Sequence, residues 1–273
     1  MRDFRVFSPT DGLTAQRWGI QNTLDTRFDT ASITKLFTSV AGLQLVGRGT
    51  LDLEKPDYSV IETKDFPPQF SDKKPTAEPG VDCRYRNVGC VLVRLAIERV
   101  TGSPHRHYVV DEVFTGPGML DSGFYDRRDA VQRVAEGWDL VDGSWVQNIY
   151  RYPPIGSPDG GVHITGKDLV RFIQAVRGAE LLNSEFTVEF FLPQMKHDDA
   201  TMYGLGLEFD LHDDGTVRSH HRDGVNAGES GIVRHFLDER LDIAVPSHLK
   251  EGAWPVIREL DERLGGQPGS ALH

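Results

Sequence analysis

The chain has 273 residues, which at about 100–200 residues per domain allows one large domain or two small ones. Its 38% hydrophobic and 26% charged residues are ordinary for a globular protein, and no triplet period, sustained heptad or low-complexity tract indicates a fibrous or disordered chain. Acidic residues outnumber basic ones by 41 to 30, for a net charge of −11, which disfavours nucleic acid and anionic membranes as partners because both require a basic face.

The sequence shows neither a signal-peptide pattern nor an apolar run long enough to cross a membrane. The residues after Met1 are not apolar enough for a signal peptide, and no window approaches the roughly 18 apolar residues of a transmembrane helix. We therefore expect a cytoplasmic protein in which Cys83 and Cys90 are free thiols. Their seven-residue separation is not a zinc spacing, so we expect no metal and no cofactor.

An amphipathic helix over Ala31–Val46 is the first strong periodic signal. Asp29 and Thr30 are cap candidates immediately before this helix, and a short strand at Phe4–Phe7 is plausible upstream. Apolar residues recur in the helix at a spacing of three to four, namely Ile33, Leu36, Phe37, Val40, Leu43 and Val46.

Two further helices are predicted in the middle of the chain. Residues 51–84 are rich in proline and irregular, after which helical spacing returns over Val88–Val100 and stops at Gly102. Thr165 and Asp168 form a capping-box-like start for the other helix.

From Tyr203 onward, short strands separated by turns predict an antiparallel meander. The expected strands are Tyr203–Phe209, Val217–His220, Gly231–Leu237 and Leu241–Pro246, and a last helix follows Gly252. This order of elements predicts an α+β fold, a single domain over residues 1–273 with an antiparallel sheet flanked by helices. One lobe would comprise about 1–55 plus 165–273, with the sheet and its packing helices, and an inserted helical lobe would comprise about 56–164.

Ser32 and Lys35 lie three residues apart at the start of the first helix, so their side chains share one face of its first turn. A serine hydroxyl is a poor nucleophile until a neighbouring base takes its proton, and a lysine kept neutral by burial can be that base. The helix N-terminus would also direct backbone N–H groups, including that of Ser32, at a developing oxyanion. The plain alternative is a surface serine and lysine on an ordinary helix.

The tripeptide Tyr85-Arg86-Asn87 immediately precedes the second helix. A tyrosine near a cationic lysine could relay protons to a leaving group, and the Asn87 amide could hold a substrate carbonyl or orient the lysine. The alternative is a core tyrosine with Asn87 as the helix cap.

A third candidate segment runs from His220 to Gly228 between two predicted strands, so its backbone could face a cleft. Adjacent strand positions point to opposite faces, which makes His220 and His221 poorly placed to share one metal ion. The alternative is a turn held by Gly224 and Gly228.

In this order, the three segments resemble the motifs of the penicillin-recognising serine hydrolases, the superfamily of class C β-lactamases, DD-peptidases and family VIII carboxylesterases. The resemblance extends over about residues 24 to 262. The other segments that are similar to the family are 26–38 around the first motif, 79–80 and 98–102 around the second, and 117–119, 159–161 and 168–172 further along. The resemblance implies a β-lactamase/transpeptidase-like fold, here shortened at the N-terminus.

The resemblance also implies roles for the first two motifs. Ser32 would be the acylated nucleophile and Lys35 its proton acceptor. Tyr85 would serve the leaving group and the deacylating water, and Asn87 would hold the substrate.

The third motif of this superfamily is Lys or His, any residue, and Gly, and it corresponds here to Arg222-Asp223-Gly224. A guanidinium cannot act as a base, but it can hold a substrate carboxylate bidentately. His221 beside it is the alternative working group. The backbone N–H of Val225 would be the second oxyanion donor, alongside that of Ser32.

We therefore expect a serine hydrolase that acts by acyl transfer, through an acyl-Ser32 intermediate, on a small ester or amide. An esterase-like activity is favoured over β-lactam hydrolysis, because a cytoplasmic enzyme is separated from peptidoglycan and the third motif is altered. The alternative is a non-hydrolytic binding or sensory relative of the same fold. A third interpretation is metal-dependent hydrolysis through His163, His220 and His221.

Overall fold

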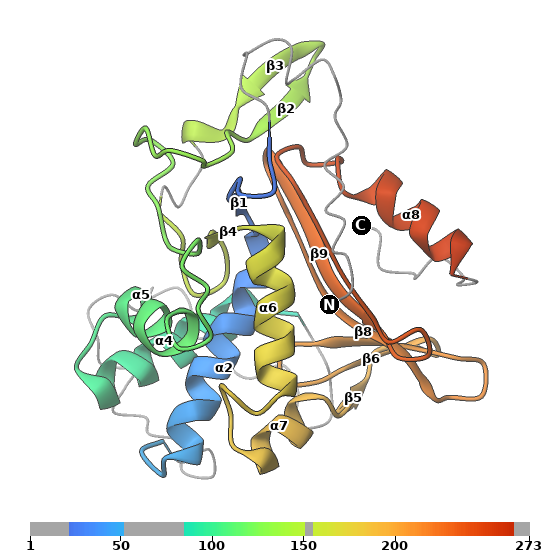
Figure 1. Ribbon diagram of the computed structural model, residues 1–273. Coiled ribbons are helices and arrows are strands. Elements are labelled where there is room, and N and C mark those ends of the chain that lie inside the picture. The colour runs from blue at the N-terminus through green and yellow to red at the C-terminus, as the bar shows by residue number, and fades with distance from the viewer. Residues whose placement is uncertain (1–21, 52–84, 151–154, 265–273) are drawn as a thin grey trace, which may run out of the picture.

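A six-stranded antiparallel sheet forms the centre of the protein (Figure 1). The computed structural model describes residues 22–51, 85–150 and 155–264, and the strand order in its main sheet is β10-β9-β8-β7-β6-β5. The strands are β5 Met195–Lys196, β6 Thr201–Tyr203, β7 Glu208–Leu211, β8 Val217–Asn226, β9 Glu229–Phe236 and β10 Leu241–Ser247. The α+β class and the antiparallel sheet flanked by helices are confirmed. The expected strand at Phe4–Phe7, the irregular region over 52–84 and Cys83 lie outside the described residues.

Two strand boundaries in the meander differ from the prediction. The single strand expected over Tyr203–Phe209 is instead the hairpin of β6 and β7, whose bend includes Gly206 at φ +117°. The segment expected to be a turn after His220 is the second half of β8, and the chain reverses only at Ala227-Gly228. Gly228 has a φ of +71°, which suits glycine at the turn, whereas Gly224 lies within the strand.

One face of the sheet is covered by α2 (Thr34–Gly47), α6 (Gly166–Arg177) and α7 (Ser184–Phe190), as Figure 1 shows. The helix α2 is buried along nearly its whole length, and the short 3-10 turn η1 (Ala31–Ile33) precedes it. The Phe37 ring packs edge-on against Phe114 and Phe172, with centroids 5.0 and 4.7 Å apart. The sequence predicted one helix from Ala31, whereas α2 begins at Thr34 and Ser32 lies in η1; this central packing gives the turn a rigid base.

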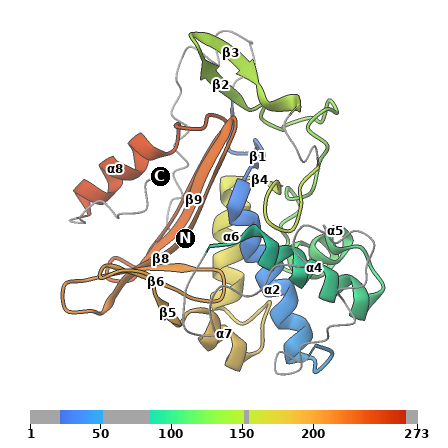
Figure 2. The same cartoon turned by 180° about the vertical axis from the view of Figure 1, so that it is seen from behind.

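The opposite face of the sheet is covered by α8 (Trp254–Arg263), seen from behind in Figure 2. Its apolar side packs in a second cluster whose buried members are Ile232, Val245, Ala253, Trp254 and Ile257. Since β9 and β10 have helices on both faces, both of their faces contribute to the core.

The segment between α2 and α6 holds α4 (Asn87–Thr101), α5 (His105–Tyr108) and the π-helical turn η3 (Val109–Phe114). The helix α4 ends at Gly102, as expected, with φ +68°. The segment also holds a hairpin of β2 (Trp138–Val141) and β3 (Ser144–Gln147), followed by η4 (Asn148–Tyr150). The sequence reasoning did not predict this hairpin. None of the helices in the described ranges could span a membrane.

A two-stranded ribbon aligns the starts of α2 and α6. Its strands are β1 (Phe28–Asp29) and β4 (His163–Ile164), which pair antiparallel. The predicted cap of α6 is confirmed, because the Asp168 N–H donates to the Thr165 side chain.

Candidate active site

Ser32 sits in a tight turn whose backbone is held by a carboxylate. The turn lies between β1 and α2, and the Ala31 N–H donates to Asp29 Oδ1 over 2.9 Å. Ala31 has a φ of +42°, a conformation that residues other than glycine rarely adopt and that persists only where neighbouring contacts impose it. Asp29 is thus a cap by its side chain, as expected, while Thr30 at the N-cap position makes no capping bond of its own.

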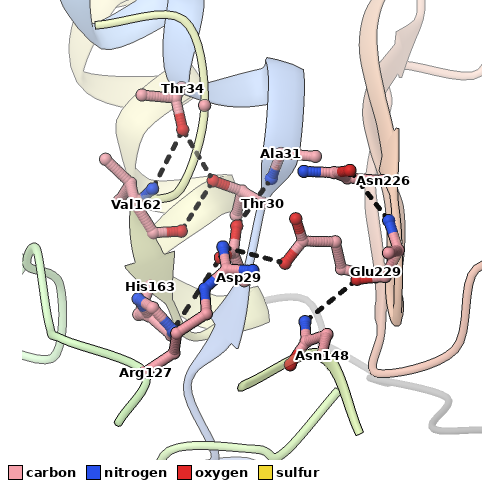
Figure 3. A network of polar contacts seen from close by, with 12 residues as sticks. Asp29, Thr30, Ala31, Thr34, Arg127, Asn148, Val162, His163, Asn226 and Glu229 are labelled. Carbon is pink, nitrogen blue, oxygen red and sulfur yellow. Dashed lines mark hydrogen bonds and ion pairs between the residues drawn. The ribbon is translucent and has the colours of Figure 1, made fainter. Parts of the chain in front are cut away.

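Thr30 and Thr34 tie the same turn to the chain before β4, as Figure 3 shows. The Thr30 hydroxyl donates to the Val162 carbonyl over 2.8 Å, and the Val162 N–H donates to Thr34 Oγ1 over 3.0 Å. All three residues are buried, so these bonds are shielded from water. The Ser32 backbone is therefore fixed from two sides.

The structure brings Ser32, Lys35 and Tyr85 together. Ser32 Oγ lies 2.7 Å from Tyr85 Oη and 3.0 Å from Lys35 Nζ. Lys35 Nζ also lies 4.9 Å from the centre of the Tyr85 ring and donates to the Asp159 carbonyl over 2.6 Å. The sequence places residues 159–161 among those that resemble the family, but it gave no sign that the Asp159 carbonyl contacts Lys35. Because this carbonyl can hold one lysine proton, the amine stays directed at Ser32.

These three side chains lie beside a cleft of about 390 Å³, which Ser32 and Tyr85 help to line. Asn87, at the start of α4, lines the same cleft, as do Gly224 and Val225 of β8. With Arg222, six of the eight residues expected at the site therefore line this cleft, and Lys35 contacts Ser32 without lining it. The cleft also includes residues that the sequence did not single out: His197, Asp198, Thr201, Tyr203 and Glu208.

Gly224 lets β8 approach the turn that carries Ser32. A Cβ at Gly224 would lie 2.7 Å from the Ser32 nitrogen and still closer to the Thr30 carbonyl oxygen. Any side chain here would push the strand away from the nucleophile turn. The close approach sets the Ser32 backbone beside the strand that carries Val225, which is the placement that two oxyanion donors from separate segments require.

Arg222 lines the cleft as expected, but it already has an anionic partner. Its Nη1 atom donates to Glu208 Oε1 over 2.6 Å, and both residues are buried. The guanidinium carbon also lies 5.1 Å from the centre of the Tyr85 ring. The Tyr85 ring is therefore in contact with two basic side chains, those of Lys35 and Arg222.

The structure corrects the substrate contact expected for His221. The imidazole is 2% exposed and does not line the cleft, and its Nδ1 atom lies 3.3 Å from Asp210 Oδ2. Burial by itself would raise the pKa of the Asp210 carboxyl, but His221 and Arg234 hold that pKa well below its usual range. His221 is thus buried inside the sheet, where it lies with Arg234 beside the Asp210 carboxylate.

The three histidines of the metal interpretation do not converge. His163 lies in β4 near Asp29, whereas His220 stacks on His235 with ring centres 5.1 Å apart. Burial lowers the pKa of His220 to about 3, so this imidazole is neutral. In the part of the chain that the structure describes, no group of three or more His, Cys, Asp or Glu residues is arranged to hold a metal ion.

A buried ion pair includes Asp29, the residue whose carboxylate holds the nucleophile turn (Figure 3). Arg127 Nη2 lies 2.7 Å from Asp29 Oδ2 and 3.8 Å from Glu229 Oε2. Burial and the neighbouring Asp29 carboxylate raise the pKa of Glu229 well above its usual value, although Arg127 acts in the opposite direction. Glu229 is therefore protonated more readily than an ordinary glutamate, and Arg127 forms its shorter ion pair with Asp29.

Comparison with known proteins adds a family and a set of relatives. The model of the Beta-lactamase family matches residues 8–57 and 57–245. Penicillin-binding protein 4* of Bacillus subtilis (strain 168) is 24% identical over 208 residues, which cover 70% of this chain and 46% of that protein. Beta-lactamase-like protein 2 of Dictyostelium discoideum is 23% identical over 239 residues, which cover 68% of this chain and 43% of that protein. The chain thus spans about half the length of these curated relatives.

Solved structures share the fold over nearly the whole chain. A penicillin binding protein from Bacillus halodurans superposes with a TM-score of 0.83 and 27% identity, covering 91% of this chain and 89% of that one. D-amino acid amidase from Ochrobactrum anthropi SV3, in complex with L-phenylalanine, superposes with a TM-score of 0.68 and 20% identity, covering 90% and 86%. At that identity, the likeness to the amidase concerns the fold alone.

Proposed function

The chain belongs to the Beta-lactamase family, a family of serine hydrolases, and we propose that it hydrolyses a small ester or amide by acyl transfer through Ser32. The membership confirms the resemblance drawn from the motifs. The observation that carries the proposal is the position of Ser32 Oγ, 3.0 Å from Lys35 Nζ and 2.7 Å from Tyr85 Oη. A nucleophile within hydrogen-bond reach of two proton-transfer groups is the arrangement that covalent catalysis requires.

In the acylation step, Ser32 Oγ attacks the carbonyl carbon of the substrate. Its proton passes to Lys35 Nζ, which accepts it in the neutral amine form, and the carbonyl electrons move to oxygen. When the tetrahedral adduct collapses, the bond to the leaving group breaks, Tyr85 gives its phenolic proton to the departing oxygen or nitrogen, and Lys35 passes the proton taken from Ser32 to the Tyr85 oxygen. The product is an ester of Ser32 and a free alcohol or amine.

Deacylation repeats the same transfers with water as the nucleophile. As Tyr85 takes a proton from the attacking water it passes its own phenolic proton to Lys35, and Lys35 gives that proton to Ser32 Oγ as the bond between Oγ and the acyl carbon breaks. The backbone N–H groups of Ser32 and Val225 are assigned to the oxyanion, which the approach of Gly224 to the Ser32 turn supports. Asn87 is assigned to the bound substrate because it lines the same cleft.

The altered third motif favours simple esters and amides over β-lactams. Arg222 takes the place of the usual lysine or histidine, and Glu208 already occupies its Nη1 donor. The fold shared with a D-amino acid amidase supports an amide as one candidate substrate. We place the protein in the cytoplasm, where such small molecules would be its partners.

The first test is a pre-steady-state assay with p-nitrophenyl acetate. The protein is expected to release a burst of p-nitrophenol, and Ser32→Ala is expected to abolish the burst because no acyl-enzyme can form. Ser144→Ala, which removes a serine from the exposed end of β3, is the matched control and should keep the burst. Full turnover by Ser32→Ala would overturn the mechanism.

A fluorophosphonate probe separates the enzyme from a non-hydrolytic binding relative of the same fold. Labelling at Ser32 that is lost in Ser32→Ala supports the hydrolase. A correctly folded protein that the probe does not label would instead favour the binding protein, because an activated serine reacts with such probes irrespective of substrate specificity.

A further inference from the structure

Glu208 and Arg222 form a buried ion pair in the wall of the cleft. Their side chains are 11% and 5% exposed, and the Nη1–Oε1 distance is 2.6 Å. Glu208 begins β7 and lies opposite His221 of the neighbouring β8, so the carboxylate comes from an adjacent strand, 14 residues earlier in the chain. Because both side chains are largely shielded from water, their opposite charges largely cancel for any group that enters the cleft.

The remaining charges on the cleft wall are acidic. Among the described residues that line it, the carboxylates outside the pair are those of Asp198 and Asp223. The Asp198 carboxylate accepts hydrogen bonds from the N–H groups of Ala200 and Thr201. Burial by itself would raise the pKa of Asp198, but these hydrogen bonds outweigh that effect and hold the pKa below its usual value, so the carboxyl stays ionised. The net charge of −11 over the whole chain has the same sign.

From this pairing we propose that Glu208 is a specificity-determining residue because it neutralises Arg222. The cleft then selects esters and amides whose part beside Arg222 is uncharged or cationic, and it rejects those that carry a carboxylate in that position. The inference rests on the proposed function of the same cleft. A guanidinium without Glu208 would attract a carboxylate bidentately, whereas the neutralised pair leaves Asp198 and Asp223 as like charges that face it. The selection is thus made by repulsion as well as by a missing attraction.

The kinetic test compares three aryl acetates that differ in charge on the leaving group. They are methyl 4-acetoxybenzoate, which is neutral, 4-acetoxybenzoate, which is anionic, and 4-(aminomethyl)phenyl acetate, which is cationic. We expect the unaltered protein to have the lowest kcat/KM for the anion. In Glu208→Gln, the kcat/KM of the anion relative to the neutral ester should rise by about tenfold, because Arg222 is then free to pair with it. Taking the ratio removes any effect that acts equally on both esters, including a shift of Tyr85.

The matched control is Glu112→Gln, which removes the same charge from an exposed pair with Arg48. Its ratio should equal that of the unaltered protein at the same ionic strength, since exposed charges are screened by salt. A ratio in Glu208→Gln that equals the control overturns the inference. If Glu208→Gln does not fold, the unaltered protein decides: equal kcat/KM for the anionic and the neutral ester overturns the inference, and rejection of the anion supports it.

A binding measurement separates this inference from the proposed function. In a Ser32→Ala background the esters are not consumed, so calorimetry gives their affinities with and without Glu208→Gln. If the relative affinity for the anion rises while the unaltered protein shows no turnover, acyl transfer is wrong and the charge selection stands. If the unaltered protein hydrolyses the esters, and Glu208→Gln changes neither the relative kcat/KM nor the relative affinity of the anionic and neutral esters, only the charge selection is overturned.

Discussion

Arg127 and Asp29 form a buried salt bridge of 2.7 Å beside the turn that carries Ser32. Asp29 contacts Arg127 through Oδ2 and accepts the Ala31 N–H through Oδ1, so one carboxylate joins the ion pair to the strained residue before the nucleophile. Arg127 does not line the cleft. It is a positioning residue that acts on Ser32 through the backbone.

Arg127→Gln is expected to reduce both stability and turnover. Removing one partner of a buried pair leaves the Asp29 charge uncompensated, which should lower the free energy of unfolding by about 3 kcal/mol. Turnover number should fall while KM changes little, because the variant disturbs the nucleophile and not the cleft wall. Urea denaturation and steady-state kinetics measure the two effects. Arg48→Gln, in an exposed pair, is the control, and equal losses in both variants would contradict the assigned role.

Glu229→Gln is expected to change how stability depends on pH. A carboxyl whose pKa is raised in the folded protein contributes stability that is fully present below its unfolded pKa, about 4.3, and is lost as the pH rises through the folded pKa. Glutamine keeps the size and neutrality of the protonated acid. The variant should therefore match the native protein near pH 4 and exceed it at pH 7 and above.

The free energy of unfolding, measured in urea from pH 4 to pH 8, tests this expectation. The native protein should lose stability relative to Glu229→Gln across that range. Parallel curves for the two proteins would show that Glu229 ionises as an exposed glutamate does. The activity of the variant is a second readout, because its neutral side chain leaves the Arg127–Asp29 pair in place.

Tyr85→Phe is expected to lower kcat by about 100-fold with little change in stability. The ring that contacts Lys35 and Arg222 remains, but the hydroxyl 2.7 Å from Ser32 Oγ is lost. Tyr85 is 49% exposed, so removing its hydroxyl leaves no buried group unpaired. Tyr125→Phe, in a residue that does not line the cleft, should keep full activity. Unchanged kcat in Tyr85→Phe would exclude the phenol from proton transfer.

Gly224→Ala is expected to disrupt the site from the strand side. The new methyl group would collide with the Thr30 carbonyl and the Ser32 nitrogen, so the strand or the turn must move, at a cost of about 1–3 kcal/mol. Activity should fall with it, because the Ser32 and Val225 N–H groups would separate. Gly89→Ala is the matched control: it has open space inside α4 and should stabilise the protein by about 0.5–1 kcal/mol. If Gly224→Ala were as active as Gly89→Ala, the close approach would have no catalytic role.

The contacts of Arg222, His221 and Asp29 could not be predicted from the sequence. In β8 the residues His220, His221 and Arg222 are all buried, so the alternation of polar and apolar residues that separates the two faces of a strand is absent. We accordingly expected the strand to end at His220, with a cleft-facing segment or a turn after it, and left His221 and Arg222 as alternatives.

What the sequence determined by itself is local: the helix that carries Lys35 directly after Ser32, the helix that follows Tyr85, the cap at Thr165, and the order of three motifs that indicates the family. These features depend on spacing along the chain, which periodicity and capping residues express directly. The tertiary structure alone decided which charges meet, such as Glu208 with Arg222 and Asp29 with Arg127. Such pairs depend on strand register and on the packing of segments up to about a hundred residues apart, and no local pattern in the chain encodes them.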